Sequence, residues 1–205
     1  MPSQTFYNLK KEKKERVMHA AIKEFGMRTY ENVNLANIIR DANIPRGSFY
    51  QYFTDKHDLY RYFYEELARM KFAFFGDLFT MQKDIPFLER FHQIYTKGFE
   101  FRLHHPELVE PSKKMMSSKV FLETEMVQQG MNYAIDLFTE FIQKDQMLGR
   151  IKKSIDARLI ATMILEFMNK ITLEDFLQDE LNVDIIHEKV LGIIEIFRKG
   201  IEIDV

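Results

Sequence analysis

The stretch that decides the fold is residues 34–58, which read NLANIIRDANIPRGSFYQYFTDKHD. Asn43 can end one short helix, because asparagine tolerates the left-handed conformation better than other side chains that carry a Cβ. Pro45 suits the start of the next helix, in which Phe49 and Phe53 stand four residues apart as buried anchors. The spacing predicts two short helices joined by a tight turn, which is helix-turn-helix geometry.

On both sides of this stretch, apolar residues repeat at helical spacing. Val17, Ala21 and Phe25 predict a helix from Lys10 to near Arg28. Asn34 is a good N-cap for the first helix of the motif, and a long helix is expected from Lys56 towards Phe79 after an acidic cap at Asp55 and Asp58. Later helix starts are expected at Pro86, at Ser117 or Ser118 and at Ser154, with a last helix near the C-terminus and breaks at His105-Pro106 and Gly149. About nine helices result.

The composition agrees with an all-α chain. Only 8 glycines and 5 prolines occur among 205 residues, so few tight turns are available for short strands. The absence of cysteine excludes disulfides, thiolate metal sites and cysteine nucleophiles, and it suits a reducing compartment. No apolar run approaches the roughly 20 residues that span a bilayer. We therefore expect a cytoplasmic protein that does not enter the membrane.

The charge is uneven along the chain. Residues 1–60 hold 10 basic and 7 acidic side chains, whereas residues 61–205 hold 19 and 24. The run Lys10, Lys11, Lys13, Lys14 and Arg16 is a plausible footprint for phosphates. The alternative is a solvated, lysine-rich helix start, and the interleaved Glu12 and Glu15 favour that alternative on charge alone.

The second helix of the motif carries the chemistry that reads DNA in the major groove. Arg46 can donate two hydrogen bonds to guanine, and Gln51 can pair a donor and an acceptor with adenine. Gly47 lets another backbone approach closely. Phosphate oxygens can accept hydrogen bonds from the hydroxyls of Ser48, Tyr50 and Tyr52. The alternative is an ordinary helical hairpin whose aromatic side chains pack against a neighbour.

Residues 17–59 resemble the DNA-binding domain of the TetR family of bacterial transcriptional regulators. The strongest part is Ile44 to Lys56, where Gly47, Tyr50, Phe53 and Lys56 fall at the family spacing. The resemblance implies that Asn34 and Lys56 meet phosphates at two other helix starts, and that Arg46, Gly47, Ser48, Tyr50, Gln51 and Tyr52 also meet DNA. Three positions depart from the family pattern: Thr29, Asn43 and Pro45.

The resemblance also implies a division into a helix-turn-helix DNA-binding domain at 1–55 and a ligand-sensing and dimerisation domain at 56–205. Most of the 12 methionines and 19 phenylalanines lie beyond residue 60, in the second part. Because methionine side chains are flexible, the interior of this part can repack around ligands of varied shape. The residues expected to line an effector pocket are Phe72, Phe75, Tyr95, Phe99, Met126, Tyr133, Met163 and Phe167. A fully packed core is the alternative for any one of them.

The last helix carries an apolar stripe that must be buried against something. Its members are Ile186, Val190, Ile193 and Phe197. A twofold dimer is the commonest solution, and the resemblance implies that the last two helices pair with their copies. Packing of both helices onto their own core is the alternative.

No catalytic constellation can be assembled from the sequence, and neither a metal nor a cofactor is expected. Glu89 and His92 have the spacing of half a carboxylate-bridged metal site, and His104 with His105 could supply a ligand. A surface helix pair and two solvated histidines are the simpler interpretations. The sequence thus predicts a homodimeric repressor that binds double-stranded DNA at a palindromic operator and is released by a small apolar or amphipathic effector. The alternatives are a helical small-molecule or lipid-binding module without DNA binding, and a helical metal enzyme.

Overall fold

The computed structural model describes residues 2–177 and 183–201, with side chains at 172–186 left outside that description. The described chain is all-α, as the sequence predicts. It forms two compact units: Met1–Ala73 with His104–Met126, and Phe74–Leu103 with Val127–Val205. The functional division at residue 55 stays a prediction. Within the described residues there are eleven α-helices where about nine were expected, because a short helix at Gln4–Tyr7 was not anticipated and the helix expected after Ser118 is two helices.

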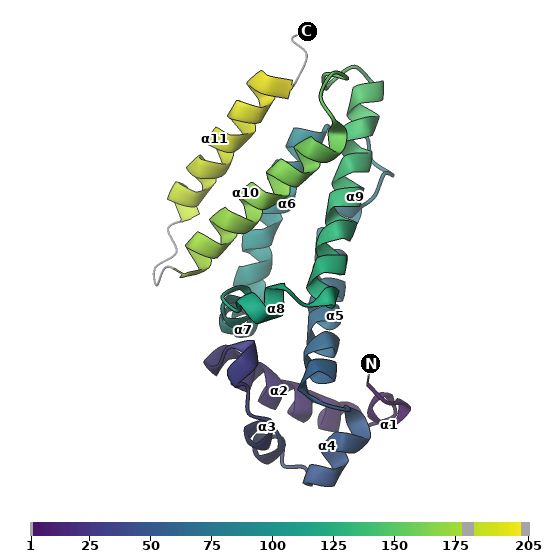
Figure 1. Cartoon of the computed structure of the whole chain (residues 1–205), viewed down its shortest axis with the longest axis vertical. Helices are drawn as coiled ribbons and strands as arrows, with labels where there is room; N and C mark the ends of the chain where they lie inside the picture. Colours follow the sequence, from purple (N-terminus) through teal and green to yellow (C-terminus); the bar gives the residue numbers. More distant parts are fainter. Residues whose placement is uncertain (1, 178–182, 202–205) are drawn as a thin grey trace. The chain divides into compact units, whose positions relative to one another are not determined.

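The first unit holds the helix-turn-helix (Figure 1). Its α-helices are α1 (Gln4–Tyr7), α2 (Lys11–Met27), α3 (Leu35–Asp41), α4 (Arg46–Tyr52), most of α5 (Lys56–Phe75), α7 (Val109–Met116) and α8 (Lys119–Leu122). Two single 3-10 turns, Tyr30–Asn32 and Pro106–Leu108, complete it. Helix α2 packs against both α3 and α7. The segment at 104–126 therefore belongs, by its packing, with the helix-turn-helix.

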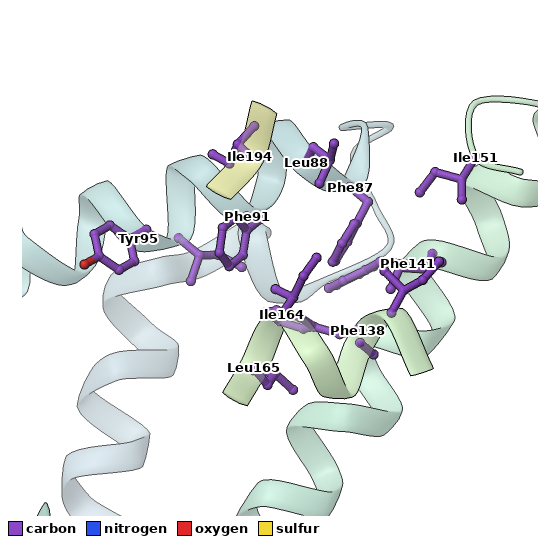
Figure 2. Packing of buried hydrophobic residues seen from close by; sticks show 14 of the residues in the cluster. Phe87, Leu88, Phe91, Tyr95, Phe138, Phe141, Ile151, Ile164, Leu165 and Ile194 are labelled. Carbon is purple, nitrogen blue, oxygen red and sulfur yellow. The ribbon is translucent and has the colours of Figure 1, made fainter. Parts of the chain in front are cut away.

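The second unit is a bundle around one hydrophobic core. Its helices are α6 (Phe87–His104), α9 (Glu125–Met147), α10 (Ala157–Leu177) and α11 (Val183–Ile201), preceded by the 3-10 turn Gly76–Phe79. Figure 2 shows Phe91 from α6, Phe138 from α9, Ile164 from α10 and Ile194 from α11 converging in that core. The apolar faces at helical spacing in the sequence are thus buried against one another.

Local signals in the helix-turn-helix act as the sequence predicts. The Asn34 side chain accepts a hydrogen bond from the Ala36 amide at 2.9 Å, which caps α3. Asn43 has φ +52° in the turn between α3 and α4. At the start of α5, Asp55 accepts from the Asp58 amide at 2.9 Å, and the Asp58 carboxylate accepts from the Thr54 amide at 3.1 Å. These caps confirm the predicted helix starts at Asn34 and Asp55.

Several boundaries beyond residue 70 differ from the sequence-based expectation. Helix α5 ends at Phe75, where Gly76 takes φ +55°, and does not reach Phe79. The single helix expected after Ser118 is two helices, because a break separates α8 from α9. The cap of α10 is Asp156 in place of Ser154, since the Asp156 carboxylate accepts from the Leu159 amide at 2.7 Å. No helix among the described residues is long and apolar enough to cross a membrane.

Candidate nucleic-acid interface

Helix α4 separates a buried apolar side from an exposed polar side. Phe49 is fully buried and Phe53 is almost so, and their rings lie 5.6 Å apart between centroids. Arg46 and Gln51 are exposed, and Tyr50 keeps 49% of its surface. A short helix that is anchored by two phenylalanines and carries donors on its free side is suited to insertion into the major groove.

Gly47 lies on the exposed part of α4. A Cβ atom built at this position would meet nothing within 4 Å, so no contact inside the chain requires a glycine there. A larger residue would be a better helix former by up to about 1 kcal/mol. The lack of a side chain leaves room on the outer surface for the close approach of another molecule.

The start of α3 is held by a buried carboxylate that the sequence interpretation did not single out. Glu24 in α2 is buried, and it accepts hydrogen bonds from the Asn34 amide at 2.9 Å and the Asn37 side chain at 3.1 Å. The Arg28 guanidinium forms an ion pair with the Glu24 carboxylate at 3.1 Å. In the sequence, Glu24 stands between the apolar residues Ala21 and Phe25, and an acid at such a position could have indicated a buried carboxylate. Glu24 thereby fixes the orientation of α3 against α2.

Another ionic cluster joins α2 to the end of α3. Lys23 lies 2.9 Å from Asp41, and Arg40 lies 2.9 Å from the same carboxylate. These hydrogen bonds, first from Lys23 and then from Arg40, hold the pKa of Asp41 below its usual range. Asp41 therefore stays ionised at neutral pH, and its charge is offset by two neighbouring cations.

Asn34 and Lys56, the two predicted phosphate contacts outside α4, are in different situations. Asn34 is exposed at the N-terminus of α3. The Lys56 ammonium donates to the carbonyl oxygens of Tyr30 at 3.1 Å and Glu31 at 2.9 Å, and it lies 5.5 Å from the centre of the Tyr30 ring. Lys56 therefore has a structural task, because it ties the start of α5 to the 3-10 turn after α2. One of its three N–H donors remains for a further acceptor.

Tyr52 differs from its sequence-based assignment. It was expected to present its hydroxyl to phosphates with Ser48 and Tyr50, but only 3% of its surface is exposed. Phe6 covers the Tyr52 ring at a centroid distance of 6.0 Å, and the Lys13 ammonium lies 5.5 Å from the ring centre. The covering residue comes from α1, a helix that the sequence interpretation missed. Ser3, which caps α1, and Phe6 three residues later were the available signal.

The predicted pocket residues are divided between the two units. Phe75 and Tyr95 belong to the core of the second unit, with Phe99 packed against it at 5.2 Å from the Tyr95 ring centroid. Tyr133, Met163 and Phe167 are exposed in the second unit. Phe72 is an exposed member of the first unit, in which Met126 helps to line a surface cavity of about 340 Å³. The structure thus brings together Phe75, Tyr95 and Phe99.

The predicted dimer residues are also divided. Val190 is buried in the core of its own chain, while Ile193 and Phe197 are only partly covered. The Ile186 side chain lies outside the described residues. On α10, Leu159, Met163 and Phe167 are exposed at steps of four residues, and Phe167 lies 6.5 Å from Phe197 between ring centroids. An exposed apolar row therefore lies on α10 and reaches Phe197 on α11, where Leu191 and Ile196 are also exposed, whereas Val190 is buried.

The residues considered for a metal site do not form one. Glu89 accepts a hydrogen bond from Gln93 at 3.0 Å, and the His92 ring packs against the His187 ring at a centroid distance of 5.4 Å. His105 lies 3.3 Å from Glu107. Over residues 2–177 and 183–201, no three histidine or acidic side chains are grouped so that they could hold a metal ion.

The chain is similar to known regulators. Residues 17–63 match the family model described as bacterial regulatory proteins, tetR family. A curated relative, an uncharacterized HTH-type transcriptional regulator of Haemophilus influenzae, is 23% identical over 145 residues, which cover 69% of this chain and 73% of the relative. These similarities are to transcriptional regulators and not to enzymes.

Solved structures agree over nearly the whole chain. A TetR family transcriptional regulator from Chloroflexus aurantiacus is 24% identical with a TM-score of 0.74 and full coverage of both chains. SmeT, the repressor of the Stenotrophomonas maltophilia multidrug efflux pump SmeDEF, is 19% identical with a TM-score of 0.75, covering 93% of this chain and 90% of SmeT. FadR from Bacillus subtilis, solved with stearoyl-CoA, is 16% identical with a TM-score of 0.71, covering 91% and 98%. Residues 17–63 thus match the tetR family model, and the chain as a whole has the fold of these transcriptional regulators.

Proposed function

We propose that this regulator binds a palindromic operator as a homodimer through α4 and is released from DNA by a small apolar or amphipathic effector, so that it acts as a repressor. The observation that carries the proposal is the exposed polar side of α4 above its two buried phenylalanines. Arg46 and Gln51 on that side have the chemistry to read guanine and adenine. The open space at Gly47 allows the DNA backbone to come close to α4.

Phosphate contacts hold α4 in register on the duplex in this proposal. Ser48 and Tyr50 supply hydroxyl donors from α4 itself, and Asn34 supplies its amide NH₂ at the start of α3. The Lys56 ammonium contributes its remaining donor. Tyr52 is left out of this set, because Phe6 and Lys13 cover it.

The homodimer is supported by the exposed apolar stripe of α10. A continuous row formed by Leu159, Met163 and Phe167 on a helix surface favours burial against a second surface. A second copy of the chain offers the same row, so a twofold axis buries both at once. Two α4 helices are then available for two half-sites, which matches the palindromic operator.

The effector site is proposed in the second unit around Phe75, Tyr95 and Phe99. Helix α5 begins at Lys56 beside the helix-turn-helix and ends at Phe75 in this aromatic core, so the same helix contributes residues to both units. A ligand that displaced Phe75 would bias the position of the same helix at Lys56. The stearoyl-CoA bound by FadR makes a long-chain acyl-CoA the first ligand to test.

A genome-fragment selection with the purified full-length protein tests DNA binding. The expected result is recovery of fragments that share a palindrome, and Gln51→Ala should then relax the preference at one base pair by about 1 to 3 kcal/mol. Gly47→Ala should weaken operator binding while leaving thermal stability unchanged or slightly raised, since its Cβ meets no atom of the chain. Recovery of no common sequence would favour the alternative, a helical small-molecule or lipid-binding module that does not bind DNA.

Calorimetry with stearoyl-CoA tests the coupling between effector binding and operator binding. If the ligand lowers operator affinity tenfold, operator DNA must lower ligand affinity tenfold, which is a coupling of about 1.4 kcal/mol. Phe99→Ala should reduce ligand binding and leave operator affinity without ligand unchanged, because Phe99 belongs to the second unit. Equal ligand affinity for free and operator-bound protein would contradict the proposed release.

A further inference from the structure

The first sixteen residues lie outside the matched family region, which begins at residue 17. N-terminal segments are usually poorly ordered unless something ties them down. Here Phe6 of α1 is fully buried, with its ring centroid 4.7 Å from that of Phe53 and 5.1 Å from that of Tyr62. The segment is therefore held against the end of α4 and the beginning of α5.

Polar contacts complete this attachment. The Ser3 amide donates to the Tyr52 carbonyl at 2.9 Å, and the Ser3 hydroxyl donates to the Gln51 carbonyl. On the other side of α1, the Lys14 ammonium donates to the Tyr7 carbonyl at 2.6 Å. Ser3, the cap of α1, thus donates to carbonyl groups in the last turn of α4. The last carbonyl groups of a helix have no partners within that helix, so they can accept these bonds.

This attachment brings a basic run next to the recognition helix. Between residues 10 and 16 there are five cations and two acids, in a chain whose formal net charge is -2. Lys13 lies over the Tyr52 ring of α4. Lys10 and Lys11 are exposed, and the acid near Lys11 is Glu15 at 3.7 Å, which is also exposed. Such a surface ion pair contributes little and leaves the cation available to an external anion.

We propose that Lys10 and Lys11, positioned by the α1 attachment, bind DNA phosphates beside the half-site that α4 reads. The inference rests on the proposed DNA binding and extends the interface beyond the family's domain. The major groove is about 12 Å wide, so a helix inside it has a phosphate backbone along each side. The basic run adjoins the C-terminal end of α4, and phosphodiesters on that side are the anions within its reach. These contacts add affinity without reading sequence.

The test uses the full-length chain with Lys10 and Lys11 both replaced by glutamine. The probes are a mixed-sequence duplex and the operator recovered by the selection, each titrated over a range of salt concentrations. Two lost phosphate contacts should lower the slope of log affinity against log salt by about 1.8. The loss of affinity should be similar for both duplexes, because phosphates carry no sequence information.

Lys119→Gln is the matched control, with Lys11→Gln as its single counterpart. Lys119 is 88% exposed and lies 3.7 Å from Glu123 four residues later, while Lys11 is 89% exposed with Glu15 at the same distance and spacing. Lys119→Gln should leave the salt slope at the wild-type value, whereas Lys11→Gln should reduce it by about 0.9. If the two substitutions changed the salt slope equally, the effect would come from the net charge of the protein and not from the position of Lys11, and the proposal would be overturned.

Phe6→Ala tests the attachment separately. Loosening α1 should lower the salt slope in the same direction as the lysine changes, while binding at low salt persists. If wild-type protein binds the operator and the double lysine variant has an unchanged slope, the phosphate extension is wrong and the proposed function stands. If wild-type protein binds neither duplex, both proposals fail.

Discussion

At the scale of single residues, Tyr50 and Tyr52 show how little sequence position alone says about a side chain's role. The two tyrosines stand two residues apart in α4 and have the same donor. Tyr50 is 49% exposed, whereas Tyr52 is 3% exposed beneath Phe6. Two residues correspond to about 200° of rotation around a helix, so the two rings leave on opposite sides.

This difference predicts opposite results for one conservative change. Tyr50→Phe should weaken binding to every duplex by about 1 kcal/mol, because it removes the proposed hydrogen bond to phosphate. Tyr52→Phe should leave DNA affinity unchanged, since its ring stays packed against Phe6. Binding titrations at one salt concentration measure the DNA affinity of both variants. Equal losses for the two variants would place both hydroxyls on the DNA.

At the scale of elements, the connection between α5 and α6 depends on one buried arginine. Arg90 in α6 is almost fully buried, and its guanidinium donates to the carbonyl oxygens of Leu78 at 2.9 Å, Thr80 at 3.0 Å and Lys83 at 2.9 Å. It also lies 4.2 Å from the centre of the Phe141 ring. The planar fork reaches several carbonyl groups at once and so shapes the segment at 76–83.

Replacing Arg90 with lysine should therefore be costly although the charge is kept. One ammonium cannot reproduce the fork, and buried carbonyl groups lose a charged donor, at about 2 kcal/mol. Urea unfolding measures the loss, and hydrogen exchange should increase at residues 76–83. Arg158→Lys is the control, because Arg158 is about half exposed and pairs with the exposed Asp136. A stability loss no greater for Arg90→Lys than for Arg158→Lys would show that the fork is dispensable.

The same connection carries a pH dependence. Asp84 accepts from Arg150 at 2.6 Å and lies 3.2 Å from Lys144, and these groups, Arg150 first, hold its pKa well below the usual range. A carboxyl with a lowered pKa in the folded state stabilises the protein above its unfolded pKa, about 3.9. That stabilisation is lost as the pH falls from there through the folded pKa.

Asp84→Asn should accordingly lower the urea midpoint at neutral pH, and the difference from wild type should shrink as the pH falls below about 4. Unfolding measured at a series of pH values provides the comparison. A difference that stayed constant down to the acid end would mean that the Asp84 charge does not contribute.

At the scale of the whole molecule, the exposed stripe on α10 gives a test of assembly. Leu159 is 54% exposed on α10 and Leu148, just beyond α9, is 53% exposed, so neither side chain supports the core of its own chain. Leu159→Glu should produce folded monomers, because a charge would be buried at the proposed twofold interface. Leu148→Glu should remain a dimer. Sedimentation measures both, and a dimeric Leu159→Glu protein would move the interface elsewhere.

The sequence by itself determined the elements of the helix-turn-helix, because their signals are local. Asn34 caps a helix through an amide two residues away, Asn43 adopts φ +52° at its own position, and Asp55 reaches an amide within one turn. Such interactions join neighbours in the chain, so the pattern of residues suffices to predict them. The polar side of α4 could be predicted in the same way, because Phe49 and Phe53 stand four residues apart and mark the buried side of that helix.

Only the tertiary structure decided which of these polar groups is free. Tyr52 is covered by Phe6 from 46 positions earlier, and the Lys56 ammonium is taken by carbonyl groups of Tyr30 and Glu31. Val190 reads as part of an outer stripe, yet it is buried in its own core. Periodicity says that a helix has an apolar face but not which segment covers it. That depends on packing between residues far apart in the chain, and burial is a property of the assembled chain.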